Sequence, residues 1–306
     1  MSQKIVFMGT PEFSVPTLES LVNSDHKVLA VYSQPPSKAN RGLKLSLSKV
    51  ELFAKEKSLT IRTPPNLDTE EEYNFLKKLN PDIVVVIAYG KIIPKRFLNL
   101  PKNGFINVHA SLLPKWRGAA PIQRSIMNLD KETGISIMKI VEDLDAGPVM
   151  QQNKIKINEN IDTLTLSKVL SQLGAKSILD ALQKIEIGEA KFHEQNHIEK
   201  TYAKKILKSE GQIQWDESAR KIIAKINALN PSPGAWFKYK NQRYKVWKAK
   251  ILNKNGEAGK VLDNKLIIGC QKQAIKILEI QKEGKSKQTT DQFLLGNSIK
   301  EGDKVY

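Results

Sequence analysis

The stretch Asn107-Val108-His109-Ala110-Ser111-Leu112-Leu113-Pro114 ends an apolar run with polar side chains and a proline turn. In a β-strand, residues i and i+2 point to the same face of the sheet. If Phe105–His109 is extended, Asn107 and His109 therefore project together into one site. An amide and an imidazole placed in this way are suitable hydrogen-bond donors for a polarised carbonyl group.

Length, cysteine content and apolar runs set limits on the class of protein. The 306 residues are enough for two domains with separate cores. Cys270 is the only cysteine, so it cannot form an internal disulfide, and a reducing cytoplasmic setting is expected. The N-terminus is too short an apolar stretch for a signal peptide, and no run is long enough to span a membrane. We therefore predict a cytoplasmic protein without membrane association, and we expect it to be a monomer.

The net charge of +17 is unevenly distributed along the chain. Residues 1–199 carry 26 Lys and Arg against 22 Asp and Glu, whereas residues 200–306 carry 23 against 10. A basic segment of this kind is attracted to the phosphate backbone of a nucleic acid. A general preference for lysine in the organism's proteins is an alternative explanation, but it does not account for the asymmetry between the two parts.

Short β-branched apolar runs alternate with amphipathic segments over the first two hundred residues. Such alternation is typical of an open, mostly parallel α/β sheet of the Rossmann-like class, with helices on both faces. The predicted strands are Lys4–Met8, Lys27–Tyr32, Ile83–Ala88, Phe105–His109 and Ile135–Ile140, and the predicted helices are Ser14–Asn23, Thr69–Leu79, Ala120–Asn128 and Leu164–Ile185. Ligands of these sheets bind at the carboxyl ends of strands, where His109, Tyr89-Gly90 and the loop after Ile140 would converge.

The composition changes after Gly188, and the polar residues 189–204 are predicted to be a linker. It would join a first domain, residues 1–188, to a basic domain, residues 205–306. The basic domain is expected to contain a helix at Ser218–Leu229 and short strands at Trp236–Tyr239, Arg243–Lys250, Gly259–Leu262, Lys265–Gly269 and Ala274–Ile280. Strands at this spacing suggest a small β-barrel of the oligonucleotide-binding (OB-fold) type.

Several common enzyme signatures are missing. The segment Gly9-Thr10-Pro11-Glu12 follows a strand but lacks the Gly-x-Gly-x-x-Gly pattern of dinucleotide-binding folds, and no Walker-type phosphate loop is present. Ser111 is not in the Gly-x-Ser-x-Gly turn of hydrolases. His193 and His197 have the spacing of one helical turn but no third ligand nearby, so we expect no metal site.

The remaining polar constellation combines Asn107 and His109 with the acidic segment Glu142–Pro148. Transfer of an acyl group needs donors for the developing oxyanion, a group that handles the amine proton and an acid that orients the imidazole. Asn107, His109 and Asp145 are residue types that fill these roles. Spacing alone nevertheless favours a structural explanation, in which Asn107 ends a strand, His109 is a core histidine and Asp145 starts a turn.

A resemblance over essentially the whole chain changes that balance. Asn107–Gln123 resembles the signature of the folate-dependent formyltransferases, and its Arg117–Ile122 part is similar to the branch of that family that acts on methionyl-tRNA. Four more segments resemble the family in the expected order, namely Val6–Phe13, Ala88–Pro94, Asp145–Pro148 and Asn230–Trp236. One short motif is weak evidence, but an ordered series of this kind is highly specific.

The resemblance implies transfer of the formyl group of 10-formyltetrahydrofolate to the α-amine of methionine on initiator tRNA, without a metal. By similarity, the catalytic residues are Asn107, His109 and Asp145, and the folate-binding segment is Ser111, Leu112, Leu113 and Pro114. The pterin pocket is also expected to include the loops near Tyr89-Gly90 and Val141–Asp145. The expected fold is the formyltransferase type of Rossmann-like sheet, followed by the OB-fold domain.

The basic residues 34–49 are expected to form a surface loop, and a solvated connection is one explanation for it. The segment Arg41-Gly42-Leu43-Lys44 resembles the basic insertion with which the family enters the acceptor end of tRNA. Arg41 aligns with the family's arginine, and Lys44 adds a second phosphate partner. The segment departs from the family's pattern because Leu43 stands where a basic residue is common and Ser46-Leu47-Ser48 lacks the usual proline.

Two other functions remain open. A formyltransferase acting on a sugar amine or a purine-pathway amine would share Asn107, His109 and Asp145 but would not need the basic tail. A noncatalytic RNA-binding protein on a degenerate enzyme fold would not need the catalytic residues. Measurable formyl transfer, and its dependence on the amine offered, separates these possibilities.

Overall fold

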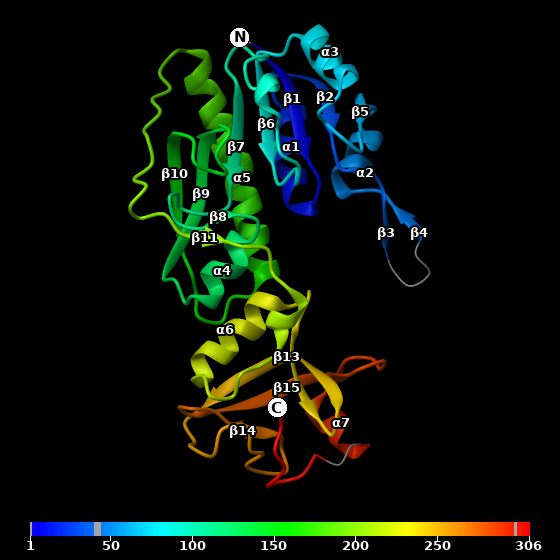
Figure 1. The fold of residues 1–306 in the computed structure, drawn as a ribbon, viewed down its shortest axis with the longest axis vertical. Helices are drawn as coiled ribbons and strands as arrows, with labels where there is room; N and C mark the ends of the chain where they lie inside the picture. The colour runs from blue at the N-terminus through cyan, green and yellow to red at the C-terminus, as the bar shows by residue number, and fades with distance from the viewer. Residues whose placement is uncertain (1, 40–43, 297–298) are drawn as a thin grey trace. The chain divides into compact units, whose positions relative to one another are not determined.

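The computed structural model describes residues 2–39, 44–296 and 299–306 of the chain. The chain divides into two compact units (Figure 1). The first unit comprises Met1–Pro121, Thr133–Ile155 and Ser167–Ala203, and the second comprises Ile122–Glu132, Lys156–Leu166 and Lys204–Tyr306. Most of the segment predicted to be a linker, residues 189–203, therefore groups with the first unit.

A seven-stranded sheet forms the centre of the first unit, in the order β10-β9-β7-β6-β1-β2-β5. Five neighbouring strands, β5, β2, β1, β6 and β7, are parallel, and β9 is antiparallel to β7. The strands are β1 (Lys4–Gly9), β2 (Lys27–Tyr32), β5 (Ile61–Arg62), β6 (Ile83–Ile87), β7 (Phe105–His109), β9 (Glu132–Lys139) and β10 (Val149–Lys156). The predicted open, mostly parallel Rossmann-like sheet is confirmed.

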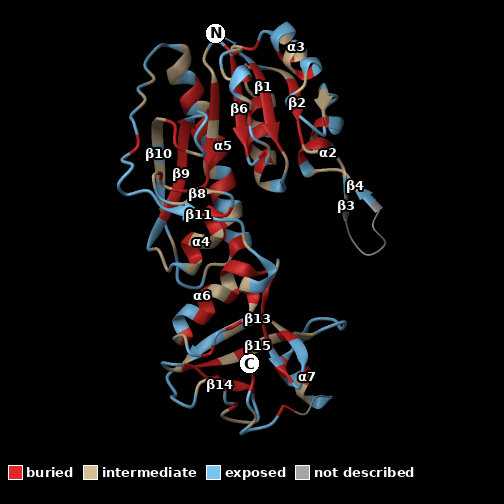
Figure 2. Ribbon diagram, viewed as in Figure 1, coloured by how far each residue is buried: buried red, intermediate tan, exposed pale blue. Residues whose placement is uncertain are grey.

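The central strands of this sheet are buried on both faces, which explains their sequences. All five residues of β6 are buried, and Figure 2 shows the same for most of β1 and β7. A continuous β-branched run is typical of a parallel strand covered on both sides. Strand β10 was not predicted because it lies at the end of the sheet, and its polar residues are only partly buried or exposed.

Helices cover both faces of the sheet. They are α1 (Val15–Val22), α2 (Lys49–Glu56), α3 (Glu70–Leu79), α4 (Pro121–Met127) and α5 (Thr163–Glu186), with short 3₁₀ helices at Glu12–Ser14 and Lys95–Phe97. On one face, Leu76 of α3 packs in a core with Val6, Val84 and Phe105. On the other face, Gly174 of α5 lies so close to β7 that a Cβ atom there would be 3.0 Å from Val108 Cγ1. Among the described residues, no helix is both long enough and apolar enough to cross a membrane.

The basic segment at residues 34–49 is not a loop throughout. Residues Ser37–Ala39 (β3) pair antiparallel with Lys44–Ser46 (β4), and the loop prediction was wrong for these six residues. Two strands of three residues are too short to leave an alternating apolar pattern in the sequence. Ser48 then caps α2, which was not predicted either, because its side-chain oxygen accepts a hydrogen bond from Glu51 N at 2.9 Å.

The second unit contains an antiparallel five-stranded sheet in the order β12-β13-β15-β14, with β16 paired to β15. The strands are β12 (Ala235–Tyr239), β13 (Gln242–Leu252), β14 (Ile267–Gly269), β15 (Ala274–Lys282) and β16 (Gln288–Thr289), with helices α6 (Ala219–Leu229), α7 (Thr290–Leu295) and a 3₁₀ helix at Lys208–Gly211. Register shifts near Lys248 disturb the β13–β15 ladder, as bulges do in curved sheets. The unit is consistent with the predicted small barrel.

One predicted strand of the second unit is wrong. Residues Gly259–Leu262 contribute only single bridges, from Lys260 to Lys304 and from Val261 to Ile268. The core of the unit is nevertheless continuous and includes an aromatic cluster, in which the rings of Phe237 and Tyr244 stack with their centroids 5.5 Å apart. This core is separate from that of the first unit.

The second unit is discontinuous in sequence. It takes in two early segments, Ile122–Glu132 and Lys156–Leu166. Arg124 forms a salt bridge of 2.6 Å with Glu210, and Thr163 Oγ1 donates a hydrogen bond of 2.6 Å to the carbonyl oxygen of Ala228. These contacts bind the early segments to the later residues of the same unit.

Candidate active site

Strand β7 places Asn107 and His109 on one face of the sheet. The strand is extended as predicted, with Asn107 opposite Val86 on β6 and opposite Met138 on β9. His109, the last residue of the strand, is 6% exposed, whereas Asn107 is partly exposed. Because the two residues are separated by one position, their side chains project from the same side.

Asp145 approaches His109 from the loop that follows β9. Its Oδ2 atom lies 3.6 Å from His109 Nδ1, which is an ion-pair distance and too long for a strong hydrogen bond. The same oxygen accepts a hydrogen bond of 2.8 Å from the main-chain nitrogen of Gly118. The structure thus brings together two residues that are far apart in the sequence, His109 and Asp145.

The second imidazole nitrogen of His109 lies 2.9 Å from the carbonyl oxygen of Trp116. A carbonyl oxygen only accepts hydrogen bonds, so His109 Nε2 carries a proton in this arrangement. Nδ1 is then the nitrogen that faces Asp145. The carboxylate of Asp145 therefore lies beside the imidazole nitrogen that is not bonded to Trp116 O.

The turn at Ser111–Pro114 is held by buried hydrogen bonds. Ser111 is fully buried, and its hydroxyl donates to the carbonyl oxygen of Lys115 at 2.6 Å. Ser136 Oγ donates to Ser111 O at 2.7 Å and accepts from Leu113 N at 3.1 Å. Gln152 Nε2 donates to Leu113 O at 2.8 Å. Hydrogen bonds within the protein therefore fix the conformation of the predicted folate-binding segment.

Three strand-end loops meet at Tyr89 and Gly90. The carbonyl oxygen of Tyr89 accepts hydrogen bonds from Thr10 Oγ1 at 2.9 Å and from Gln34 Nε2 at 3.1 Å. Gly90 has a φ of +79°, and a Cβ atom there would lie 2.2 Å from Gln34 Nε2. Glycine is therefore required, and the loops after β1, β2 and β6 come together at the carboxyl end of the parallel strands. The loop after Ile140 was predicted to begin at this end as well, which is wrong: β9 is antiparallel to β7, and Ile140 N donates to Phe105 O at the start of β7.

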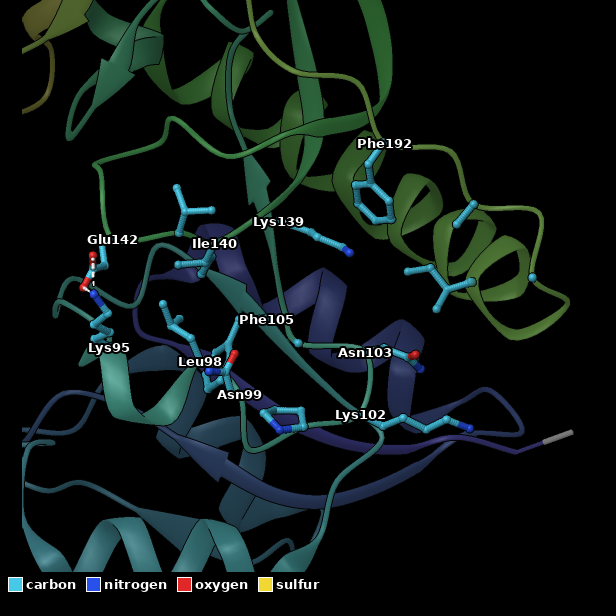
Figure 3. Close-up of a pocket in the computed structure, with 16 residues that line it drawn as sticks. Lys95, Leu98, Asn99, Lys102, Asn103, Phe105, Lys139, Ile140, Glu142 and Phe192 are labelled. Carbon is cyan, nitrogen blue, oxygen red and sulfur yellow. Dashed lines mark hydrogen bonds and ion pairs between the residues drawn. The ribbon is translucent and has the colours of Figure 1, made fainter.

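A cavity of about 700 Å³ lies in the first unit (Figure 3). It includes Val141 and Glu142 of the predicted pterin loop, and Glu142 forms a salt bridge of 2.8 Å with Lys95. Other lining residues are Leu98, Phe105, Lys139, Ile140, Ile185 and Phe192. The lining does not include Asn107, His109 or Asp145, so the cavity itself does not enclose the predicted catalytic residues.

Of the two predicted tRNA-binding residues of the basic insertion, one lies in β4. Arg41 lies outside the described residues, and Lys44 is the first residue of β4. The strands β3 and β4 place the two ends of the segment 40–43 next to each other, because Ala39 pairs with Lys44.

The second unit presents cations stacked on tryptophan rings. The guanidinium carbon of Arg243 lies 4.0 Å from the ring centroid of Trp236, and Lys245 Nζ lies 4.0 Å from that of Trp247. A cavity of about 290 Å³ is lined by Lys208, Ser232, Pro233, Trp236, Arg243, Lys245, Gln281 and Glu283. Clustered cations and aromatic rings of this kind suit contact with a nucleic acid.

Cys270 is buried, and the described residues contain no cluster of possible metal ligands. Cys270 is 2% exposed, and burial raises the pKa of its thiol to about 12, so it is not a ready nucleophile. Within the described ranges, no three His, Cys, Asp or Glu side chains are grouped so that they could hold a metal ion.

Gln195, which was not predicted, is part of the surroundings of Asp145. It is 6% exposed and donates a hydrogen bond of 2.9 Å to the carbonyl oxygen of Asp145. It was missed because it stands in the polar segment predicted to be a linker, where a glutamine carries no distinguishing pattern.

The family models match both parts of the chain. Residues 3–182 match the formyl transferase model, and residues 205–298 match the model of the formyl transferase C-terminal domain. The chain belongs to the formyltransferase family. This formyltransferase is 52% identical to the methionyl-tRNA formyltransferase of Pelagibacter ubique, with 100% of this chain and 99% of the relative covered. It is 42% identical to that of Paramagnetospirillum magneticum, with 98% of each chain covered.

A solved crystal structure has the same fold as this formyltransferase. The crystal structure of HypX from Aquifex aeolicus in complex with tetrahydrofolic acid matches with a TM-score of 0.68 and 17% sequence identity. The match covers 96% of the formyltransferase and 47% of HypX, so this chain spans about half of that longer protein. At this identity the likeness concerns the fold alone.

Proposed function

We propose that this formyltransferase transfers the formyl group of 10-formyltetrahydrofolate to the α-amine of the methionine carried by initiator tRNA. The product is N-formylmethionyl-tRNA for translation initiation. The observation that carries the proposal is the 52% identity, over the full length, to a relative named methionyl-tRNA formyltransferase. The approach of Asp145 to His109 at the end of β7 supports an acid–base site at that position.

In the proposed reaction the amine attacks the formyl carbon, and the bond from this carbon to the folate nitrogen breaks. Asn107 and His109 donate hydrogen bonds to the developing oxyanion. Asp145 orients the imidazole and relays the proton lost by the amine to the departing folate nitrogen, directly or through water. His109 Nε2 donates to Trp116 O. The hydrogen bond from His109 to the oxyanion therefore uses a proton on Nδ1, or it comes from Nε2 after the Trp116 carbonyl has moved away. No covalent enzyme intermediate and no metal are needed.

Two loops of the first unit carry exposed apolar side chains that support folate binding. Ile92 is 87% exposed, Leu144 is 64% exposed and Val141 is 38% exposed. Ile92 lies in the loop after β6, and Val141 and Leu144 lie in the loop after β9. Large apolar side chains that these loops leave open to solvent are available to contact a flat, partly apolar ligand. We propose that these loops and the segment formed by Ser111, Leu112, Leu113 and Pro114 hold the folate cosubstrate.

Replacing Val141 with aspartate is expected to weaken folate binding at least about tenfold, because a charged group would be desolvated by the ligand. Binding of 5-formyltetrahydrofolate, measured by isothermal titration calorimetry, checks the effect. Val169→Asp is the matched control, since Val169 on α5 is 41% exposed. Equal affinities for both variants would contradict the proposed folate surface.

For the tRNA we propose two contact regions, the basic insertion with Arg41 and Lys44, and the basic C-terminal part. The proposed organisation is a catalytic domain at residues 1–188, a linker at 189–204 and a tRNA-binding domain at 205–306. The family-model matches, which end at residue 182 and resume at 205, support this division. We further propose that the enzyme is a cytoplasmic monomer without membrane association.

The affinity for tRNA is expected to fall about 100-fold when salt is raised from about 50 to about 200 mM, if about four phosphates are neutralised. Filter binding or fluorescence anisotropy at several salt concentrations checks the slope. The double variant Lys248→Glu and Lys250→Glu, on exposed positions of β13, should flatten it, whereas Lys176→Glu on α5 should not. A flat salt response of the unmodified protein would contradict a backbone-binding role.

One assay tests the proposed function against the alternatives. The enzyme is given 10-formyltetrahydrofolate with initiator methionyl-tRNA, elongator methionyl-tRNA or an amino sugar nucleotide, and formylated product is measured. We expect transfer to initiator methionyl-tRNA above the other two. Preference for the amino sugar would favour a sugar formyltransferase, and absence of transfer to all three would favour a noncatalytic RNA-binding protein.

A further inference from the structure

All hydrogen-bonding positions of the buried Gln195 amide are occupied. Its Nε2 atom donates to Asp145 O at 2.9 Å and to Gly147 O at 2.8 Å. Its Oε1 atom accepts from Arg117 Nε at 3.0 Å and from Arg117 Nη2 at 2.7 Å. An amide offers two N–H donors and two acceptor lone pairs, so each of them has a partner here.

Arg117 determines which way round this amide lies. A flipped amide would turn its N–H groups toward the guanidinium donors and its oxygen toward two carbonyl oxygens, which is unfavourable at both ends. Arg117 is 3% exposed, and burying a guanidinium against a neutral acceptor costs free energy. Arg117 and Gln195 thus form a pair, called the clamp below, whose burial costs free energy and whose hydrogen bonds allow one orientation of the Gln195 amide.

The clamp holds a main chain that needs support. Asp145 has a φ of 49°, a left-handed conformation that residues with a Cβ atom adopt less readily than glycine does. Gly147 lies so close to Lys139 that a Cβ atom would be 2.0 Å from its carbonyl oxygen. Gln195 joins the carbonyl groups of Asp145 and Gly147 and so braces the turn.

The same clamp reaches the carboxylate of Asp145. Gly118, the residue after Arg117, donates its main-chain N–H to Asp145 Oδ2 at 2.8 Å. Gly118 is itself fixed against Ala203 of β11 (Tyr202–Ala203), with which β8 (Arg117–Gly118) pairs. Both the main chain and the side chain of Asp145 are therefore held by residues 117, 118 and 195.

We propose that Gln195, oriented by Arg117, is a positioning residue that keeps Asp145 beside His109. This inference rests on the proposed function, in which Asp145 acts on His109. Gln195 and Arg117 act through Asp145, so neither is a catalytic residue.

Two substitutions of Gln195 test the clamp in the full-length enzyme. Gln195→Glu still accepts from Arg117 but cannot donate to the carbonyl groups of Asp145 and Gly147, and Gln195→Met keeps the size and removes the hydrogen bonds. Both should lower kcat about 10- to 100-fold, as small displacements of reacting groups do. KM for both substrates should stay within about threefold, because the groups that bind them are unchanged.

Gln151→Glu is the matched control. Gln151 Nε2 also donates to a main-chain carbonyl, that of Ser177 at 3.0 Å, but it has no bond to the Asp145 turn. This variant should keep its kcat. A loss of kcat equal to that of Gln195→Glu would overturn the proposal, because any lost amide bond would then have the same effect.

A double-mutant cycle tests whether Arg117 acts through Gln195. Arg117→Lys alone should lower kcat, since a lysine lacks the guanidinium fork, but it should add little in the Gln195→Met background. Additive effects of the two substitutions would show that Arg117 acts independently and would overturn the assignment of the pair.

A substrate-free measurement separates this proposal from the proposed function. The chain has four histidines, so the ring signals of His109 are assignable by ¹⁵N NMR. At a fixed pH, Gln195→Glu and Gln195→Met should shift these signals as Asp145 moves, and Gln151→Glu should not. Unchanged His109 signals or full kcat in both Gln195 variants would overturn the clamp. Inactivity of the unmodified protein toward methionyl-tRNA would instead overturn the proposed function, with the NMR result still deciding the clamp.

Discussion

His109→Ala is expected to lower kcat for the formylation of initiator methionyl-tRNA about 1,000-fold. The substitution removes a hydrogen-bond donor to the oxyanion and the group that exchanges a proton with Asp145. These contributions arise mainly in the transition state, so KM for the tRNA and the folate should change little. Steady-state kinetics with purified protein measures both parameters.

The control for this variant is His197→Ala. His197 is exposed, whereas His109 is 6% exposed and faces Asp145. The control should retain the full kcat. Near-normal turnover by His109→Ala, with the fold verified by circular dichroism, would remove His109 from the mechanism.

Asp145→Asn is expected to lower kcat about 100- to 1,000-fold. The asparagine has the same shape, and its oxygen can still accept the hydrogen bond from Gly118 N. The change therefore removes the negative charge 3.6 Å from His109 Nδ1 without removing the bond that places the side chain. Rapid-quench measurement of a single turnover would assign the loss to the chemical step.

Asp25→Asn controls for a general loss of negative charge. Asp25 is exposed and lies between α1 and β2, outside the loops proposed to hold the folate. Its substitution should leave the single-turnover rate unchanged. If Asp145→Asn were as active as Asp25→Asn, the charge of Asp145 would have no part in formyl transfer.

The parts of the fold that burial controls were predictable from the sequence. Lys27–Tyr32 and Phe105–His109 match β2 and β7 residue for residue, because strands buried on both faces need continuous apolar runs. The edge strand β10 was not predicted, since its residues are only partly buried or exposed and are therefore weakly constrained. The β3–β4 pair was not predicted because strands of three residues leave no alternating pattern. The strand predicted at Gly259–Leu262 was wrong for the opposite reason. Val261 is buried, but burial of a residue does not require that its segment pair with another strand over several residues.

The candidate site was predictable only in part. The two-residue spacing of Asn107 and His109 indicates a shared face wherever the strand is. The approach of Asp145 could not be deduced from spacing, because a loop of unknown course separates it from β9, and the resemblance to a family supplied it. Gln195 could not be predicted for a different reason: its proposed role depends on four hydrogen bonds to Arg117, Asp145 and Gly147, and none of these three residues is near it in the sequence.

The interleaved second unit has a consequence for synthesis on the ribosome. Arg124 precedes its partner Glu210 by 86 residues, and at about 5–20 residues per second it is made roughly 4 to 17 s earlier. Until those later residues are made, Ile122–Glu132 and Lys156–Leu166 lack Glu210 and Ala228, the partners of Arg124 and Thr163. The hydrophobic core of the second unit consists of residues between Ile213 and Val305, so this core forms only after the last third of the chain has been synthesised.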